Sequence, residues 1–134
     1  MTAFDTNVLI YACDRADSKR QAKALELIAS SNDGILLWQV ACEFIAASRK
    51  LSPQGFTQDD AWNRLTDFLS LFPLVTPSPQ VLMGAEELHL KQGWSFWDAM
   101  IVAACVECGV TRLYSEDLPG RAGPSGVEVV NPFD

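Results

Sequence analysis

The chain has 134 residues, which is typical of a single domain with a sizeable hydrophobic core. Hydrophobic residues make up 49% of the sequence and charged residues 20%, the ordinary composition of a globular protein in water. The formal net charge of −7 argues against a protein that coats nucleic acid through a basic surface. It fits an acidic pocket, a bound metal ion or a basic protein partner equally well.

The cysteines and the N-terminal segment indicate the cellular compartment in which we expect the protein. All four cysteines occur in apolar segments with a helical pattern, where a free thiol packs as a small hydrophobic side chain: Cys13, Cys42, Cys105 and Cys108. The N-terminal segment lacks the basic residues of a signal peptide, and no apolar run is long enough to cross a bilayer. We therefore expect a reduced protein of the cytoplasm.

The N-terminal half is predicted to alternate between short strands and helices. The expected strands are 2–5 and 35–38, and the expected helices are 6–13, 17–31, 39–50 and 58–72. An Asn-Asp-Gly turn precedes the second strand, and residues 51–56 are expected to form a loop. Thr57 is the expected N-cap of the last of these helices.

Two of these helices carry an apolar stripe that predicts the buried face. The expected buried residues of the helix at 17–31 are Ala22, Leu25, Ile28 and Ala29, opposite Lys19, Arg20 and Lys23. The expected apolar stripe of the helix at 58–72 consists of Trp62, Leu65, Phe68, Leu69 and Phe72.

The C-terminal half continues the alternation. It gives strands at 73–77, 111–115 and 127–131, helices at 78–92 and 96–108, and a loop at 116–126. The helix at 96–108 is apolar on every side, so we expect its first turn to lie inside the protein. The whole pattern predicts an α/β fold: a mostly parallel sheet of about five short strands, covered by helices on both faces in three layers.

Three carboxylates stand alone in apolar segments. Asp5 is the only charged side chain in residues 1–13, and Glu43 is the only one in residues 34–48. Asp98 has the same isolation in residues 92–106. A carboxylate buried without a partner costs several kcal/mol, so each of these side chains needs compensation.

Each acid also has a simpler structural explanation. Asp5 could cap a helix, and Glu43 could extend to solvent from a half-buried helix. Asp98 could complete a capping box with Ser95. Taken together, the three favour a common site, because Asp5 would lie at the carboxyl edge of the sheet, where open parallel sheets bind their ligands.

A fourth carboxylate, Asp117, follows a predicted strand directly and would lie at the same edge, although a local turn bond could also explain it. Ser115 could supply a hydroxyl ligand or orient a carboxylate. Two charges about 4 Å apart repel by roughly 4 kcal/mol at an effective dielectric constant near 20, and a hard divalent cation reverses that repulsion. Oxygen ligands without a nearby histidine or cysteine favour Mg²⁺ or Mn²⁺ over zinc.

A cation in such a site suits the hydrolysis of a phosphodiester, because it polarises the phosphate and lowers the pKa of an attacking water. This also reconciles the acidic chain with a nucleic-acid substrate. Basic side chains outside the site could bind the rest of the backbone: Lys19, Arg20, Lys23, Arg49 and Lys50.

The same segments resemble the PIN domain family. The matching stretches are FDTNVLIYA at the N-terminus, VACEFIAA around Glu43, WDAMIVAA around Asp98 and LYSEDL around Asp117. The resemblance covers the whole chain in order, as a single domain over residues 1–134, and it is strongest to the ribonuclease toxins of VapBC-type toxin–antitoxin pairs.

This resemblance implies a Mg²⁺- or Mn²⁺-dependent endoribonuclease, the toxin of a type II pair, that cuts single-stranded or looped RNA and leaves a 5′-phosphate and a 3′-hydroxyl. It also implies a homodimer and a cognate VapB-type antitoxin, whose tail inserts a basic side chain among the carboxylates. The implied catalytic and metal-binding residues are Asp5 and Asp98 as principal ligands, Glu43 and Asp117 as the other acidic positions, and Asn7 and Ser115 in support.

Other interpretations fit less well. An aspartyl-phosphate phosphatase would need a second aspartate where Asn7 stands, and a receiver-like phospho-acceptor domain would need an early acidic pair and a strand-end lysine that the chain lacks. A degenerate PIN domain that only binds protein or RNA is the main alternative, against which the four intact acids argue. Cys105 and Cys108 form a lone pair that favours core packing over zinc.

Overall fold

A five-stranded parallel sheet forms the centre of the computed structural model, which describes residues 1–118 and 126–134. The strands lie in the order β3-β2-β1-β4-β5, and every neighbouring pair is parallel. Their bounds are β1 Thr2–Phe4, β2 Gly34–Leu37, β3 Leu74–Val75, β4 Arg112–Tyr114 and β5 Glu128–Val130. The predicted sheet is confirmed. Of the predicted loop at 116–126, residues 119–125 lie outside the described residues.

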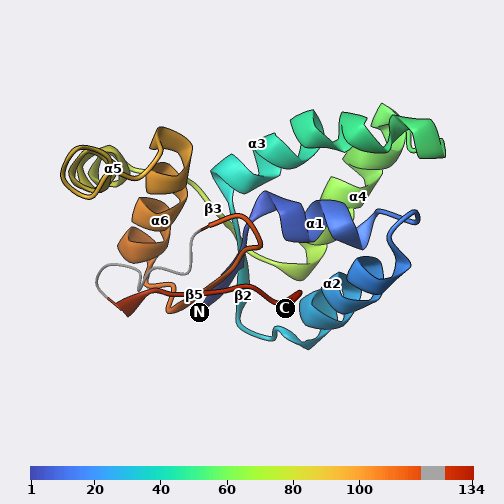
Figure 1. Ribbon diagram of the computed structural model, residues 1–134, viewed down its shortest axis with the longest axis horizontal. Coiled ribbons are helices and arrows are strands. Elements are labelled where there is room, and N and C mark those ends of the chain that lie inside the picture. Colours follow the sequence, from blue (N-terminus) through green and yellow to red (C-terminus); the bar gives the residue numbers. More distant parts are fainter. Residues whose placement is uncertain (119–125) are drawn as a thin grey trace.

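Helices cover both faces of this sheet, as the alternation predicted. Helices α1 to α4 lie on one side in Figure 1, and α5 and α6 lie together on the other. Their bounds are α1 Thr6–Ala12, α2 Ser18–Ser30, α3 Trp38–Ala47, α4 Gln58–Leu71, α5 Pro79–Lys91 and α6 Phe96–Cys108, with a 3₁₀ helix, η1, at Ser48–Gln54. The three-layer α/β/α arrangement is therefore present.

Strand β1 occupies the middle of the sheet, between β2 and β4. Thr2 pairs with Gly34 on one side and with Arg112 on the other. Because the strands are parallel and in register, the residues that follow Phe4, Leu37 and Tyr114 emerge at one edge. Helices α1 and α3 begin at that edge without a connecting loop.

The N-cap predicted at Thr57 is confirmed, whereas the capping box considered for Ser95 and Asp98 is absent. Thr57 caps α4 in a full capping box with Asp60, and Gly109 ends α6 in the left-handed conformation at φ 80°. Two boundaries were wrong. Trp38 begins α3 instead of ending β2, and the expected loop at 51–56 continues the chain as η1, because Leu51 is buried against the core.

The predicted buried faces of two helices were partly wrong. In α2, Ala24 and Ile28 are buried whereas Leu25 is 46% exposed. In α4, Leu65 and Phe68 are buried as predicted. Trp62 was expected to be buried but is 58% exposed, and the neighbouring Ala61 is buried instead. The remaining differences are of the same kind: Ala22, Ala29 and Leu69 are exposed. Helix α2 packs mainly against α1 and helix α4 mainly against α3. A small alanine on the packed face allows two helices to approach closely, so the larger side chains turn outward.

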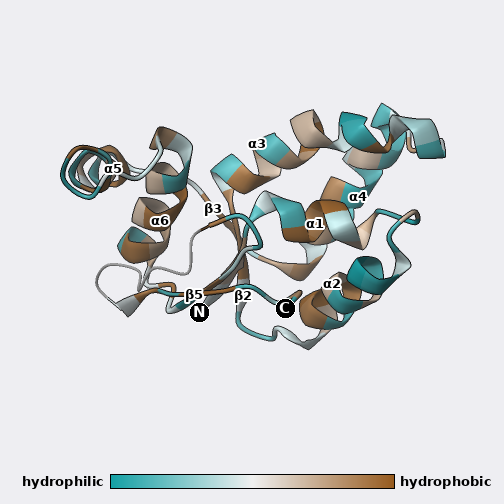
Figure 2. Cartoon of the chain, in the orientation of Figure 1, coloured by the Kyte–Doolittle hydropathy of each residue, from teal (hydrophilic) through white to brown (hydrophobic). Residues whose placement is uncertain are grey.

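The core lies between the sheet and the two helical layers. The largest fully buried side chains include Phe4, Leu9, Leu36, Phe44 and Leu113, which come from three strands and two helices. Figure 2 shows hydrophobic residues on the central strands and a mixture of hydrophobic and hydrophilic residues along the helices. In the described part of the chain, none of the helices has the length and apolar character needed to span a membrane.

Helix α6 differs from the prediction at its start. Its first turn was expected inside the protein, but Phe96 and Trp97 are exposed, and the helix becomes buried only from Ala99 onward. The four cysteines are free, and Cys42 is exposed, contrary to the expectation that all four pack in the core.

The cysteines provide a test of this packing. At pH 8 we expect iodoacetamide to alkylate Cys42 rapidly and Cys105 very slowly, because Cys105 is fully buried and burial raises the pKa of its thiol. Cys13 should also react slowly, since burial raises its pKa to about 11. Mass spectrometry of the peptides gives the rates; equal rates for Cys42 and Cys105 would contradict the packing of α3 and α6.

Candidate functional site

The four acids singled out from the sequence line one pocket at the carboxyl edge of the sheet. This carboxylate pocket has a volume of about 770 Å³. Its polar lining includes Asp5, Thr6, Asn7, Asp14, Glu43, Lys50, Asp98 and Asp117. Among the described residues that line it, Lys50 is the only basic one. The sequence prediction that these acids converge on one region is therefore supported by their positions.

Asp5 is the buried member of the group and sits where β1 gives way to α1. It is the N-cap of α1, and one carboxylate oxygen accepts a hydrogen bond from the Thr6 backbone N–H at 2.7 Å. The other oxygen accepts a 2.7 Å bond from the Ser115 hydroxyl. These two bonds are the compensation that a side chain only 7% exposed requires.

The electrostatic surroundings of Asp5 oppose its charge. Burial raises the pKa of the Asp5 carboxyl, and the charges of Glu43 and Asp117 raise it further. The hydrogen bonds from Ser115 and Thr6 act in the opposite direction but do not cancel the shift. Glu43 and Asp117 therefore lie close enough to Asp5 for their negative charges to disfavour its ionised form.

Ser115 is fully buried and connects β4 to this carboxylate. It follows Tyr114, the last residue of β4, and its hydroxyl both donates to Asp5 and accepts from the Leu118 backbone N–H at 3.2 Å. The expectation that Ser115 orients a carboxylate agrees with this geometry. The hydroxyl holds the carboxyl ends of two neighbouring strands, β1 and β4, in a fixed relation.

Glu43 reaches the pocket from the middle of α3. Its two oxygens accept hydrogen bonds from the Thr6 hydroxyl at 2.9 Å and from the Gln39 side-chain amide at 2.7 Å. It is therefore held in place and does not extend freely into solvent. Sequence reasoning missed Thr6 and Gln39, although both are polar residues in otherwise apolar segments directly beside a singled-out acid or one helical turn from it.

Asp98 lies half-buried in the first turn of α6 and lines the same pocket. The simpler explanation, a capping box with Ser95, is not observed, because Ser95 makes no side-chain cap hydrogen bond. Within the described residues, Asp98 forms no side-chain hydrogen bond or ion pair. Of the four acids, it is the one whose carboxylate is left available for a ligand.

Asp117 is exposed at the rim and is placed by Asn7. The Asn7 amide donates to Asp117 at 3.0 Å, while its carbonyl oxygen accepts from the Glu116 backbone N–H at 3.4 Å. Helix α1 thus supplies both the N-cap carboxylate and the side chain that holds the segment after β4. The sequence-predicted supporting roles of Asn7 and Ser115 are consistent with these contacts.

Glu116, between Ser115 and Asp117, bonds to different partners. It accepts hydrogen bonds from the Tyr11 hydroxyl at 2.6 Å and from the Arg20 guanidinium at 2.9 Å. Partial burial alone would raise the pKa of Glu116, but these two donors outweigh it and lower the pKa. Arg20 is thereby engaged with Glu116 and Asp17.

The family comparison agrees with this arrangement. A family profile described as PIN domain matches residues 3–118, which is most of the chain. The chain belongs to the PIN domain family. PIN domains are in general nucleases and typically use a divalent metal ion. A search of curated proteins finds no significant match.

Solved PIN-like structures share the fold at low sequence identity. The chain is similar to one from a toxin–antitoxin complex of Klebsiella pneumoniae, with a TM-score of 0.68, 22% identity and 98% of each chain covered. It is also similar to a chain of VapBC2 from Rickettsia felis bound to a DNA fragment from their promoter, with a TM-score of 0.70, 18% identity and 97% of each covered. PAE2754 from Pyrobaculum aerophilum has a TM-score of 0.63 at 21% identity, covering 96% of this chain and 89% of its own.

The carboxylates of this PIN domain are suitable ligands for a divalent cation, but they do not form a complete binding site in advance. Within residues 1–118 and 126–134, no three histidine, cysteine, aspartate or glutamate side chains stand together closely enough to hold an ion. Mg²⁺ does not need such a cage, because it keeps several waters and is commonly bound through one or two carboxylates. A carboxylate that accepts one hydrogen bond per oxygen also retains lone pairs for a cation.

The Tyr11–Glu116 bond can be tested as an anchor of the segment that carries Asp117. We expect Tyr11→Phe to lower the free energy of unfolding by about 1–2 kcal/mol, because it removes a hydrogen bond to a charged acceptor. The ring contact of Tyr11 with Phe133, at 4.9 Å between centroids, can remain in the variant. Urea denaturation measures the change; an unfolding free energy equal to that of the wild type would show that the bond does not anchor the segment.

Proposed function

We propose that this PIN domain, taken as one domain over residues 1–134, is a Mg²⁺-dependent endoribonuclease and the toxin of a type II toxin–antitoxin pair, with Mn²⁺ as an alternative ion. The observation that carries the proposal is the carboxylate pocket, which is lined by a buried Asp5 and by an Asp98 that has no partner among the described residues. Helix capping accounts for the hydrogen bonds of Asp5, but it does not account for Asp98, whose half-buried carboxylate has no partner among the described residues.

The residues of the pocket divide into ligands and supports. Asp5 and Asp98 would hold the cation, with Glu43 and Asp117 as further acidic groups. When bound, the cation would polarise the scissile phosphate and lower the pKa of an attacking water. Ser115 and Thr6 keep Asp5 in one orientation, so the acid is arranged before any substrate arrives.

In this proposal Lys50 would bind the substrate. It lines the carboxylate pocket at the 3₁₀ helix η1, where its ammonium can contact an RNA phosphate outside the acids. Arg20 was expected to serve the same purpose, but its guanidinium already pairs with Glu116 and Asp17.

The regulatory partners follow by similarity. Two structures with the same fold come from toxin–antitoxin complexes. A VapB-type antitoxin with a basic tail would complement both the carboxylate pocket and the net charge of −7. We also propose a homodimer in the cytoplasm, where RNA and the antitoxin are present.

A PIN domain that binds protein or RNA without cutting is the competing function. The hydrogen bonds that already occupy Asp5, Glu43 and Asp117 favour it to some extent. The Asp98 carboxylate argues for the enzyme, because a binding module has no need of a half-buried acid that lacks a partner in residues 1–118 and 126–134.

The cleavage test uses purified protein and RNA with Mg²⁺ or with EDTA. We expect cleavage only with Mg²⁺, and a loss of at least 100-fold in Asp5→Asn, because a neutral amide is a poor ligand for a hard cation. Asp5→Asn should nevertheless be as stable as the wild type in thermal denaturation. Asparagine can cap α1 through its side-chain oxygen and donate its amide N–H to the Ser115 hydroxyl, and the variant no longer buries a charge.

The matched control is Asp59→Asn, which neutralises an exposed acid in the first turn of α4, away from the pocket. It should cut RNA like the wild type. Cleavage that persists in EDTA or in Asp5→Asn would reject the proposed mechanism, and a wild type that binds an antitoxin but cuts no RNA would favour the binding module.

A further inference from the structure

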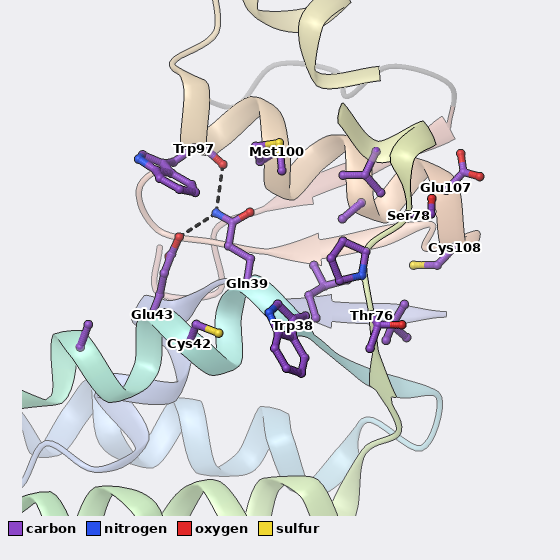
Figure 3. A pocket seen from close by; sticks show the side chains of 16 residues that line it. Trp38, Gln39, Cys42, Glu43, Thr76, Ser78, Trp97, Met100, Glu107 and Cys108 are labelled. Carbon is purple, nitrogen blue, oxygen red and sulfur yellow. Dashed lines mark hydrogen bonds between the residues drawn. The ribbon is translucent and has the colours of Figure 1, made fainter. Parts of the chain in front are cut away.

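A second hollow opens directly beside the carboxylate pocket and has the opposite character. This apolar groove, of about 550 Å³, lies between the start of α3, the connection from β3 into α5, and α6 (Figure 3). Its walls are mainly hydrophobic, with contributions from Trp38, Val75, Val81, Trp97, Met100 and Ala104. The volume is within the range of about 300–1,000 Å³ found for small-molecule sites.

The groove and the carboxylate pocket share part of their lining. Glu43, Ala46 and Trp97 border both spaces. Trp97 is 61% exposed, although an indole is a large apolar surface to leave in solvent. A strand of RNA whose phosphate occupies the carboxylate pocket would therefore pass Trp97 as it leaves toward the groove.

The charges of the groove restrict what it can take. Its charged lining residues are Glu43 and Glu107, and no lysine or arginine is among the described residues that form it. A phosphate or another anion is therefore unsuited to it. A flat, neutral, aromatic group that stacks on an indole fits both the apolar walls and the absence of basic side chains.

Gln39 gives the groove one directed polar atom close to this boundary. Its side-chain N–H group donates to Glu43 at 2.7 Å and to the backbone carbonyl of Trp97 at 3.3 Å. Figure 3 shows both bonds, with the Gln39 carbonyl oxygen turned away from these two acceptors. That oxygen can accept a hydrogen bond from the exocyclic amine or a ring N–H of a base.

We propose that the apolar groove binds one unpaired nucleobase, that of the nucleotide next to the scissile phosphate. The proposal rests on the proposed ribonuclease function and deepens it by assigning a base subsite. The base stacks on Trp97 and enters the groove, and Gln39 accepts a hydrogen bond from its edge. Only a single-stranded or looped RNA can release a base in this way, because a paired base remains in its helix.

Two kinds of variant test the subsite: one blocks the groove and the other removes the aromatic ring on which the base stacks. Ala104→Phe fills the groove from a position on α6 that does not line the carboxylate pocket. Trp97→Ala removes the stacking surface, and Trp97→Phe is the variant that should restore it. Val106→Leu is the matched control, because Val106 is also on α6 and partly exposed but does not line the groove. Circular dichroism verifies that each variant folds.

Fluorescence anisotropy in EDTA measures the binding of a short, labelled, single-stranded RNA and of an abasic RNA of equal length. Both carry the same phosphates, so their repulsion from the acids cancels in the comparison. We expect the wild type, Val106→Leu and Trp97→Phe to bind the intact RNA about tenfold more tightly than the abasic one, which is the scale of base stacking on an aromatic ring. Ala104→Phe and Trp97→Ala should lose this preference.

Equal binding of intact and abasic RNA by the wild type would overturn the proposal, and so would an Ala104→Phe variant that keeps the full preference. A change of oligomeric state or of antitoxin binding in Ala104→Phe, with RNA binding unchanged, would assign the groove to a protein partner and overturn it too. Cleavage is assayed in parallel. A wild type that cuts RNA but shows no base preference would leave the ribonuclease function intact and reject the base subsite. A wild type that shows the preference but never cuts would support the base subsite and reject the ribonuclease.

Discussion

The buried carboxylate of Asp5 is the interaction on which the rest of the site depends. Three parts of the chain meet at it: β1, which ends one residue earlier, α1, which it caps, and Ser115 at the end of β4. A sheet of parallel strands in register delivers these groups to one edge because all its carboxyl ends coincide. Moving any of the three would leave a charge in the protein without its donors, so the fold and the site constrain each other.

The site is arranged at the expense of ordinary electrostatic stability. Burial and the neighbouring acids raise the pKa of Asp5, so the ionised form that a cation would bind is disfavoured in the protein by itself. Proteins keep such groups where function requires them. The contrast with Glu116 supports this view, because that carboxylate is neutralised by Arg20 and fixed by Tyr11, as a purely structural acid would be. Asp5 follows β1, whereas Glu116 lies in the segment after the neighbouring strand β4.

The alternation of strands and helices and the acidic positions could be predicted from the sequence, because they depend on local signals. A lone charge in an apolar segment, a Thr57 before a helix and a Gly109 after one can each be recognised without knowledge of the fold. The predicted buried faces of α2 and α4 were partly wrong, since the side of a helix that packs against its neighbouring helix depends on close contacts through small residues such as Ala24 and Ala61. The apolar groove left no trace in the sequence, because its walls come from distant segments that are brought together only by the crossover from β3 through α5 and α6.

The central claim is that Asp5 and Asp98 together attract a divalent cation at the sheet edge. The most direct measurement is a titration of the ¹⁵N-labelled protein with Mn²⁺ at substoichiometric amounts, in which paramagnetic broadening identifies the amides near the ion. The account predicts that the signals of Thr6, Glu43 and Ala99 broaden first and that an excess of Mg²⁺ restores them. Broadening that begins instead at the exposed acids in the first turn of α4, or no selective broadening anywhere, would contradict it.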